Sequence, residues 1–113
     1  MVSNKFSVAV VVSDGRKSAK WFKEKVGLKA STQGHWVLVW PEGAGTKIHL
    51  CEGKPDPGNT GIAFYVKDPH KVAGEMKKKG VKFTKVTDDG PVKLAFFGDP
   101  DGNPLYLSES KWG

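Results

Sequence analysis

His49 is the side chain best suited to chemistry in this sequence. An imidazole changes charge near neutral pH, so it can serve as an acid, a base or a ligand for a divalent ion. It stands between two aliphatic residues in Ile48-His49-Leu50, a pattern typical of a strand whose side chains alternate between two faces. Two interpretations of His49 remain open: a polar residue bonded to a neighbour, or a residue that contacts a ligand or transfers protons.

The other histidines and the single cysteine offer less. His35 stands at the start of a predicted strand and His70 falls in the first turn of a predicted helix, so we expect both at the surface. Cys51 has no partner cysteine, which excludes an internal disulfide, and no predicted helix N-terminus beside it. We therefore expect Cys51 to pack inertly in its strand. The sequence has neither a nucleophile elbow nor a glycine-rich phosphate loop.

The strongest local pattern is a turn at residues 99–103, Asp-Pro-Asp-Gly-Asn. Pro100 presets its own backbone angle, and Gly102 or Asn103 can adopt a positive φ. Apolar residues precede this segment and alternate after it. The pattern predicts a strand, a tight turn and a second strand.

The elements that must position these residues occur twice in the same order. Each copy begins with an apolar strand, then an aspartate (Asp14 or Asp68) before a helical pattern that a glycine ends. Asp68 is followed by Pro69 at the first helical position, which suits proline. Three strands follow each helix. The predicted strands are residues 6–12, 28–32, 35–40, 46–51, 61–66, 81–86, 92–97 and 104–109, and the helices end at Gly27 and Gly80.

This repeat, with the turn at residues 99–103, resembles the vicinal oxygen chelate superfamily, also called the glyoxalase, bleomycin-resistance and dioxygenase superfamily. The resemblance extends from about Lys5 to Glu109. It implies an α+β fold in which two tandem βαβββ modules form curled mixed sheets around a cleft. The expected organisation is a single domain over residues 1–113, with module one at about 5–52, a linker at about 53–60 and module two at about 61–109.

Metal-dependent members of this superfamily hold one divalent ion in the cleft, on the first and fourth strands of each module. When the strands are matched to the family one position at a time, the resemblance implies that these ligand positions are Ser7, His49, Gly61 and Tyr106. Only His49 is a good ligand for such an ion, whereas a catalytic metal normally has about three protein ligands. We therefore predict no metal and no other cofactor, and this favours binding over catalysis.

Alternation along the strands indicates what would line the implied cleft. Four positions on the strand faces expected to line this cleft carry small side chains, and Tyr65 lies on the same face as two of them. The small residues are Ser7, Ala9, Gly61 and Ala63. Trp36 and Trp40 share one face of their strand and supply flat rings suited to planar ligands. The predicted ligand-binding residues are His49, Tyr106, Trp36, Trp40, Ser7 and Tyr65. Two alternatives remain open. The small residues could instead permit tight contact between the sheets, and the tryptophans could instead lie in the core or in a dimer interface.

Composition limits the partners. The chain has 113 residues and a net charge of +6. Among its 18 basic residues only Arg16 is arginine, and lysine is poor at bidentate contacts with phosphates or bases, so we expect no nucleic-acid partner. No apolar run approaches the length of a membrane span, and the N-terminus lacks the shape of a signal peptide. The sequence predicts a cytoplasmic protein without a membrane partner.

The sequence thus favours metal-independent binding or sequestration of a small planar or aromatic organic molecule, as the resemblance to bleomycin-resistance proteins implies. The resemblance also implies a homodimer, formed by the commonest closed symmetry. The alternative is a metal-dependent enzyme of the glyoxalase, ring-cleaving dioxygenase or thiol-transferase kind. A third class is a protein that uses the fold for assembly or regulation.

Overall fold

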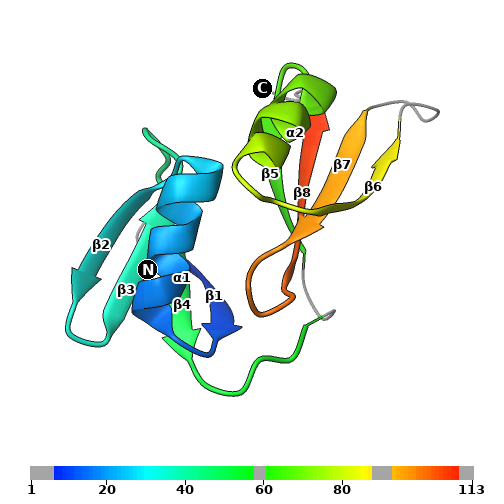
Figure 1. Ribbon diagram of the computed structural model, residues 1–113. Helices are drawn as coiled ribbons and strands as arrows, with labels where there is room; N and C mark the ends of the chain where they lie inside the picture. Colours follow the sequence, from blue (N-terminus) through cyan, green and yellow to red (C-terminus); the bar gives the residue numbers. More distant parts are fainter. Residues whose placement is uncertain (1–6, 58–60, 88–92, 110–113) are drawn as a thin grey trace. The chain divides into compact units, whose positions relative to one another are not determined.

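The computed structural model describes residues 7–57, 61–87 and 93–109 (Figure 1). The chain divides into two compact units, Met1–Asp56 and Pro57–Gly113, and the division falls inside the segment expected to be a linker. Phe6 and Val92, predicted to begin two of the strands, lie outside the described residues, as do linker residues 58–60.

The first unit is a four-stranded mixed sheet with one helical segment. Its strand order is β1-β4-β3-β2, with β1 parallel to β4 and the other neighbours antiparallel. The predicted helix divides into an α-helix and a π-helical segment, because the amide of Gly27 donates to the carbonyl of Phe22, five residues earlier. The elements are β1 (Ser7–Val12), α1 (Gly15–Trp21), η1 (Phe22–Val26), β2 (Lys29–Gln33), β3 (Trp36–Trp40) and β4 (Lys47–Glu52).

The second unit repeats this arrangement. Its sheet has the order β5-β8-β7-β6, again with the first strand parallel to the last. The predicted fold, with two similar βαβββ halves, is confirmed, and the strand limits differ from the predicted ones by no more than two residues. The elements are β5 (Ile62–Val66), α2 (Pro69–Lys78), β6 (Phe83–Thr87), β7 (Leu94–Gly98) and β8 (Pro104–Glu109).

Both helices begin as the sequence predicts. The carboxylate of Asp14 accepts a hydrogen bond from the amide of Lys17, and the carboxylate of Asp68 accepts one from the amide of Lys71. Each aspartate thereby satisfies an amide that the first helical turn leaves without an intrahelical partner.

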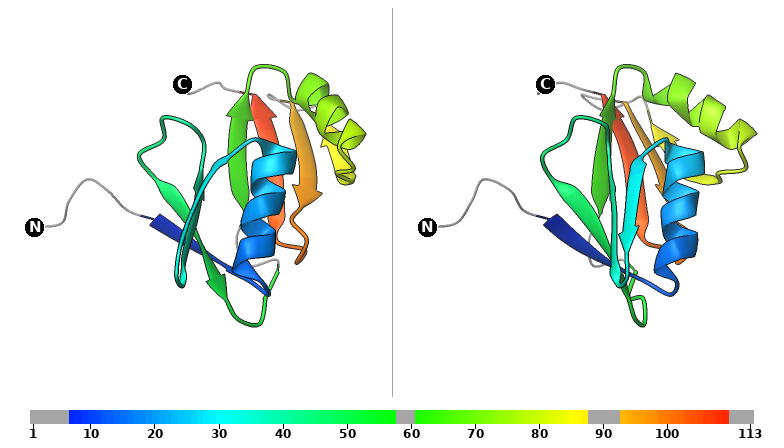
Figure 2. Two further views of the ribbon diagram at one scale, coloured as in Figure 1. Left: turned by 60° about the vertical axis from the view of Figure 1, so that its left-hand side comes forward. Right: turned by 90° about the vertical axis from the view of Figure 1, so that its left-hand side faces the viewer.

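In each unit the helix covers one face of its own sheet (Figures 1 and 2). Side chains on that face are buried: Val39 and Leu50 in the first unit and Ala95 and Leu107 in the second are at most 1 % exposed. Phe22, at the join between α1 and η1, is fully buried. Alternation therefore turns the remaining side chains of each strand toward the opposite face, called here the open face of each sheet.

The turn between β7 and β8 is organised by a buried carboxylate. Asp99 is only 6 % exposed, and its Oδ1 accepts hydrogen bonds from the amides of Asp101 and Asn103 at 3.0 and 2.8 Å. Its Oδ2 accepts a third from the side-chain amide of Asn103 at 2.9 Å. The carboxylate thus satisfies donors inside the turn that burial would otherwise leave unpaired.

Gly102 completes this turn with a φ of 83°, so the predicted positive φ is confirmed. Its amide donates to the carbonyl of Asp99 at 2.9 Å. We expect Gly102→Ala to lower the free energy of unfolding by about 1–2 kcal/mol, because a Cβ disfavours the left-handed conformation. Denaturant titration measures the loss.

Gly74→Ala is the matched control. Gly74 lies inside α2, and a Cβ there would meet no atom within 4 Å. Alanine should raise the free energy of unfolding by about 0.5–1 kcal/mol, since it favours the helix. Equal effects of the two substitutions would contradict the turn geometry.

Candidate functional site

The strand register places His49 on the open face of the first sheet. His49 of β4 pairs with Ala9 of β1 on one side and Leu38 of β3 on the other. Ser7, another of the predicted ligand-binding residues, pairs with Lys47, two residues earlier along β4. Ser7 shares the face of His49 but is not its direct neighbour.

His49 contacts both an aromatic ring and a thiol. Its imidazole stacks on the indole of Trp36, with ring centroids 4.3 Å apart and planes inclined by 26°. Its Nδ1 lies 3.4 Å from the Sγ of Cys51, two residues further along the same face of β4. Both interpretations of His49 therefore retain support: it has bonded neighbours, and it is half-buried on an open face.

The two tryptophans of β3 lie on this open face, away from the helix-covered core. Trp36 is 60 % exposed, so most of its surface is accessible despite the stack on His49. Trp40 is half-buried, and the ammonium of Lys47 lies 4.1 Å from the centroid of its ring. A cation at that distance over an indole is a favourable electrostatic contact. This face therefore combines flat rings with positive charge.

A pocket of about 240 Å³ opens beside this face. His49 and Cys51 of β4 form part of its wall, and Val37 of β3 adds an apolar side chain to the lining. The remaining lining residues come from the start of α1, the turn between β2 and β3 and the end of β4: Arg16, Gly34, His35 and Glu52. The pocket thus combines a thiol, two imidazoles and both signs of charge.

Glu52 ties two walls of this pocket together. Its Oε1 accepts a hydrogen bond of 2.9 Å from the amide of Gly15, at the start of α1. A Cβ at Gly15 would lie 3.2 Å from Val37 and 3.4 Å from Glu52, so glycine permits this close approach. The carboxylate therefore fixes the start of α1 against the end of β4, which places Arg16 at the pocket.

The second sheet also carries aromatic side chains on its own open face. Tyr106 of β8 pairs with Ala63 of β5 and with Phe96 of β7. Its ring stacks on Phe96 with centroids 5.4 Å apart and an interplanar angle of 30°. Tyr65, on the same face of β5, is 58 % exposed. A Cβ at Gly61 would lie 3.6 Å from the ring of Tyr106, so a small residue leaves room beside that ring.

The four positions that the resemblance assigns to metal ligands are divided between the two sheets, and their chemistry does not suit a divalent ion. Ser7 and His49 belong to the first unit, and Gly61 and Tyr106 to the second. Glycine offers no side-chain donor, and neutral serine and tyrosine hydroxyls are weak ligands. Within the described part of the chain, no three His, Cys, Asp or Glu side chains are grouped so that they could hold a metal ion.

Of the seven described residues that line the pocket, only His49 was predicted as a site residue. Arg16, Gly34, His35 and Glu52 come from a helix start, a turn and a strand end, where no periodic pattern applies, and Cys51 was expected to pack inertly. His35 is exposed, as expected, but it also lines the pocket. One sequence feature could have drawn attention to this site: Arg16 is the single arginine in a chain whose other basic residues are lysines.

The surface prediction for His70 was wrong. His70 is half-buried, and its Nε2 lies 3.2 Å from the carbonyl oxygen of Thr87 at the end of β6. This contact joins the first turn of α2 to a strand 17 residues away along the chain. The reason is tertiary: the sequence position gives no sign that the end of β6 passes this turn.

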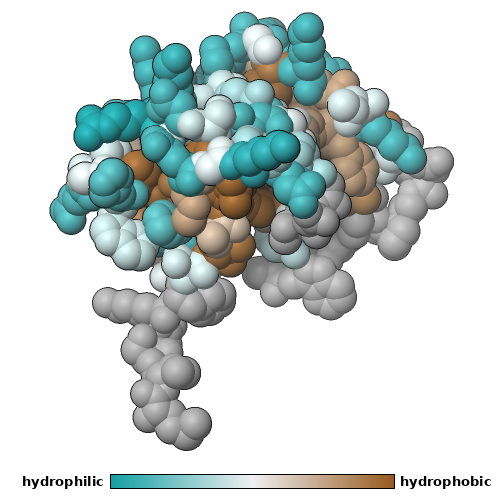
Figure 3. All heavy atoms as spheres, turned by 90° about the horizontal axis from the view of Figure 1, so that it is seen from below, coloured by the Kyte–Doolittle hydropathy of each residue, from teal (hydrophilic) through white to brown (hydrophobic). Residues whose placement is uncertain are grey.

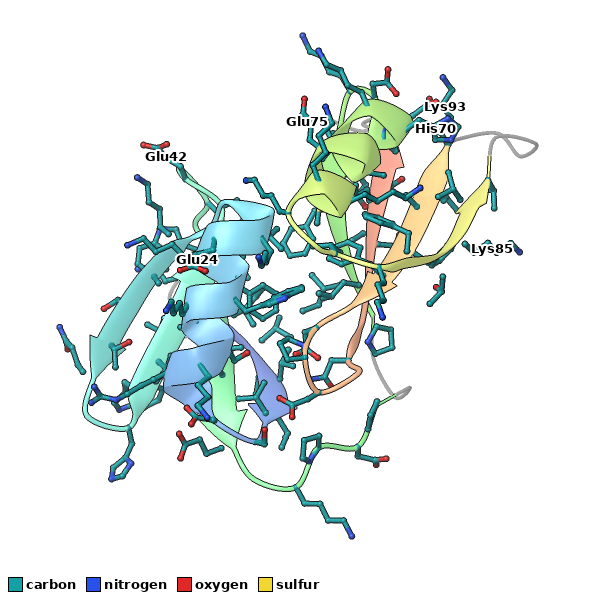
Figure 4. The ribbon with its side chains drawn as sticks, viewed as in Figure 1. Glu24, Glu42, His70, Glu75, Lys85 and Lys93 are labelled. Carbon is teal, nitrogen blue, oxygen red and sulfur yellow. The ribbon has the colours of Figure 1, made fainter. Side chains whose placement is uncertain are left out.

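Several charged side chains are solvated. Glu24, Glu42, Glu75 and Lys85, which are labelled in Figure 4, are all exposed. On the face shown in Figure 3, long hydrophilic side chains stand out and hydrophobic ones are exposed between them. No helix among the described residues is long and apolar enough to cross a membrane.

The family model of the glyoxalase/bleomycin resistance protein/dioxygenase superfamily matches residues 6–107 of this chain, and the chain belongs to this superfamily. The match covers both units, in agreement with the repeated βαβββ order.

Solved structures with this fold are similar over almost the whole chain. A member of the superfamily from Sphaerobacter thermophilus DSM 20745 is 27 % identical, with a TM-score of 0.85, over 96 % of this chain and 98 % of that one. TnmS3, an antibiotic-binding protein from Streptomyces sp. CB03234, is 26 % identical with a TM-score of 0.81, over 96 % of each chain. A glyoxalase/bleomycin resistance protein from the same Streptomyces strain is 26 % identical with a TM-score of 0.74, over 92 % of this chain and 98 % of that one.

The donor set leads to a prediction about metal content. Protein purified without an affinity tag should contain far less than one equivalent of zinc, iron, manganese or nickel by elemental analysis, because three of the four positions lack a strong ligand. About one equivalent that survives mild chelation would contradict this prediction.

The open-face position of Trp36 predicts a modest role in stability. Trp36→Ala should lower the free energy of unfolding by about 1 kcal/mol, chiefly through loss of the stack on His49. Phe22→Ala, in the core of the same unit, should cost about 3–5 kcal/mol. Denaturant titration compares the two, and equal losses would show that Trp36 is a core residue.

Proposed function

We propose that this protein binds and sequesters a small planar or aromatic organic molecule without a metal. The observation that carries this proposal is Trp36, which is 60 % exposed yet held in place by its stack on His49. A flat ring that is both accessible and fixed offers a large contact area at little cost in conformational entropy.

Positive charge near these rings favours a ligand that also carries an anionic group. Lys47 lies over Trp40, and Lys29 of β2 pairs with Trp40 on the same open face. The chain as a whole has a net charge of +6, which attracts anions toward its surface. The ligand chemistry that fits is a planar ring system with a carboxylate, sulfonate or phenolate substituent.

The open face of the second sheet supports the same chemistry. Phe96 and Tyr106 stack on each other, and Lys85 of β6 pairs with Phe96 on that face. Rings beside a lysine therefore occur on both sheets. We propose that Tyr106 and Tyr65 contact ligand on the second sheet, and that Ser7 does so on the first.

Similarity to known proteins supports a binding function, but it does not identify the ligand. TnmS3 is an antibiotic-binding protein, and the chain shares its fold over almost the full length of both proteins at 26 % identity. The donor set argues against the metal-dependent alternative, since only His49 among the four positions is a good ligand. Homodimer formation, implied by the resemblance, stays a prediction.

Anthraquinone-2-sulfonate, a planar anion, is a suitable probe. It should quench tryptophan fluorescence in a saturable titration, and Trp36→Ala should weaken its binding by about 1–3 kcal/mol, the range for stacking on an aromatic side chain. Isothermal titration calorimetry gives the affinity independently of fluorescence.

Val8→Ala is the matched control for this experiment. Val8 is 38 % exposed and pairs with Ile48 on the helix-covered face of the same sheet. Its truncation should leave the affinity unchanged. Absence of saturable binding by planar anions, or an equal loss in both variants, would overturn the proposed function.

A further inference from the structure

We propose that Cys51 is a nucleophile, with His49 as its proton acceptor, and that it captures planar electrophiles covalently in the pocket of the first unit. This inference rests on the proposed function, because the aromatic face would deliver the planar molecule. It goes beyond sequestration, since the captured molecule becomes bonded to the protein. It also replaces the expectation that Cys51 packs inertly.

Three observations meet at this thiol. Cys51 is half-buried and lines the pocket of about 240 Å³, so its sulfur borders a space that a small molecule can enter. The Nδ1 of His49 lies 3.4 Å from its Sγ, within hydrogen-bonding distance for sulfur. Arg16 lines the same pocket, where its positive charge is accompanied by the carboxylate of Glu52. A thiol within hydrogen-bonding reach of a base, at the border of a pocket, is the arrangement expected of a nucleophile paired with its proton acceptor.

Trp36 fixes the base. Its indole stacks on the imidazole with ring centroids 4.3 Å apart, which restricts rotation of the His49 side chain. In the tautomer with the proton on Nε2, Nδ1 presents a lone pair to the thiol of Cys51. The ring that would stack on an arriving planar molecule therefore also holds the base that activates the nucleophile.

The chemical step is conjugate addition to an electron-poor double bond. The thiol proton passes to Nδ1 of His49, and the sulfur forms a bond to one carbon while the carbon–carbon π-bond breaks. The electron pair moves onto the adjacent carbonyl group as an enolate, which the imidazolium then protonates. Atoms and electrons balance without an oxidant, a reductant or a metal. Substrates of this class are quinones, maleimides and other planar unsaturated carbonyl compounds.

N-phenylmaleimide and N-ethylmaleimide are matched probes, since they share the electrophile and differ in the planar ring. Intact-mass spectrometry follows adduct formation, and Cys51 is the one cysteine in the chain. We expect wild-type protein to react with N-phenylmaleimide about tenfold faster than glutathione does at the same pH. The preference for the phenyl over the ethyl reagent should also exceed that of glutathione. A rate no greater than that of glutathione overturns the proposal.

His49→Gln tests the base. It should reduce the rate by about tenfold or more, as expected when a general base is removed. Denaturation midpoints establish that the variant is folded, and His49→Asn serves if it is not. Cys51→Ser should form no adduct, which excludes reaction at lysines. An unchanged rate in a folded His49 variant contradicts the role of the base.

Reversible binding is measured separately with anthraquinone-2-sulfonate on the wild-type protein. Binding of this anion without accelerated adduct formation would overturn the covalent step and leave the proposed function standing. Accelerated adduct formation without binding of this anion would support the covalent step and overturn the proposed function.

Discussion

One-sided burial of each sheet is the constraint on which the rest of this structure depends. Among the described residues, each unit has one helical segment, and it packs on one face of the sheet. The covered face contains side chains such as Val39 and Leu107 that are at most 1 % exposed. Because side chains alternate along a strand, fixing the apolar set against the helix fixes every remaining side chain on the other face. The positions of Trp36 and His49 follow from the burial of their neighbours.

The sequence was sufficient for the fold because local and periodic signals agree with each other. Asp14 and Asp68 begin helices in both copies, and the turn closed by Gly102 has the positive φ that its composition predicts. The same alternation that buried Leu50 predicted the face of His49. Single-sequence reasoning succeeds where neighbouring residues determine the outcome.

The pocket was beyond this kind of reasoning. Its walls come from the start of α1, the β2–β3 turn and the end of β4, and a hydrogen bond between Gly15 and Glu52 joins two of them across 37 residues. The contact of His70 with Thr87 is equally non-local. The division of the first helix into α1 and η1 at Phe22 is likewise not specified by the helical period of the sequence.

Strand β4 places the residue that the resemblance assigns to a metal-ligand position among side chains of other chemistry. Its open face presents Lys47, His49 and Cys51 in succession, so a cation, a base and a thiol follow each other at intervals of about 7 Å. With the other family positions occupied by serine, glycine and tyrosine, His49 is left without the companions that a divalent ion requires. Its imidazole instead lies beside the thiol of Cys51 and stacks on the ring of Trp36. A shift of the β4 register by one residue would turn Ile48 and Leu50 to the open face and place all three polar side chains against the helix. The packing of the first unit and the chemistry of its open face therefore depend on the same register.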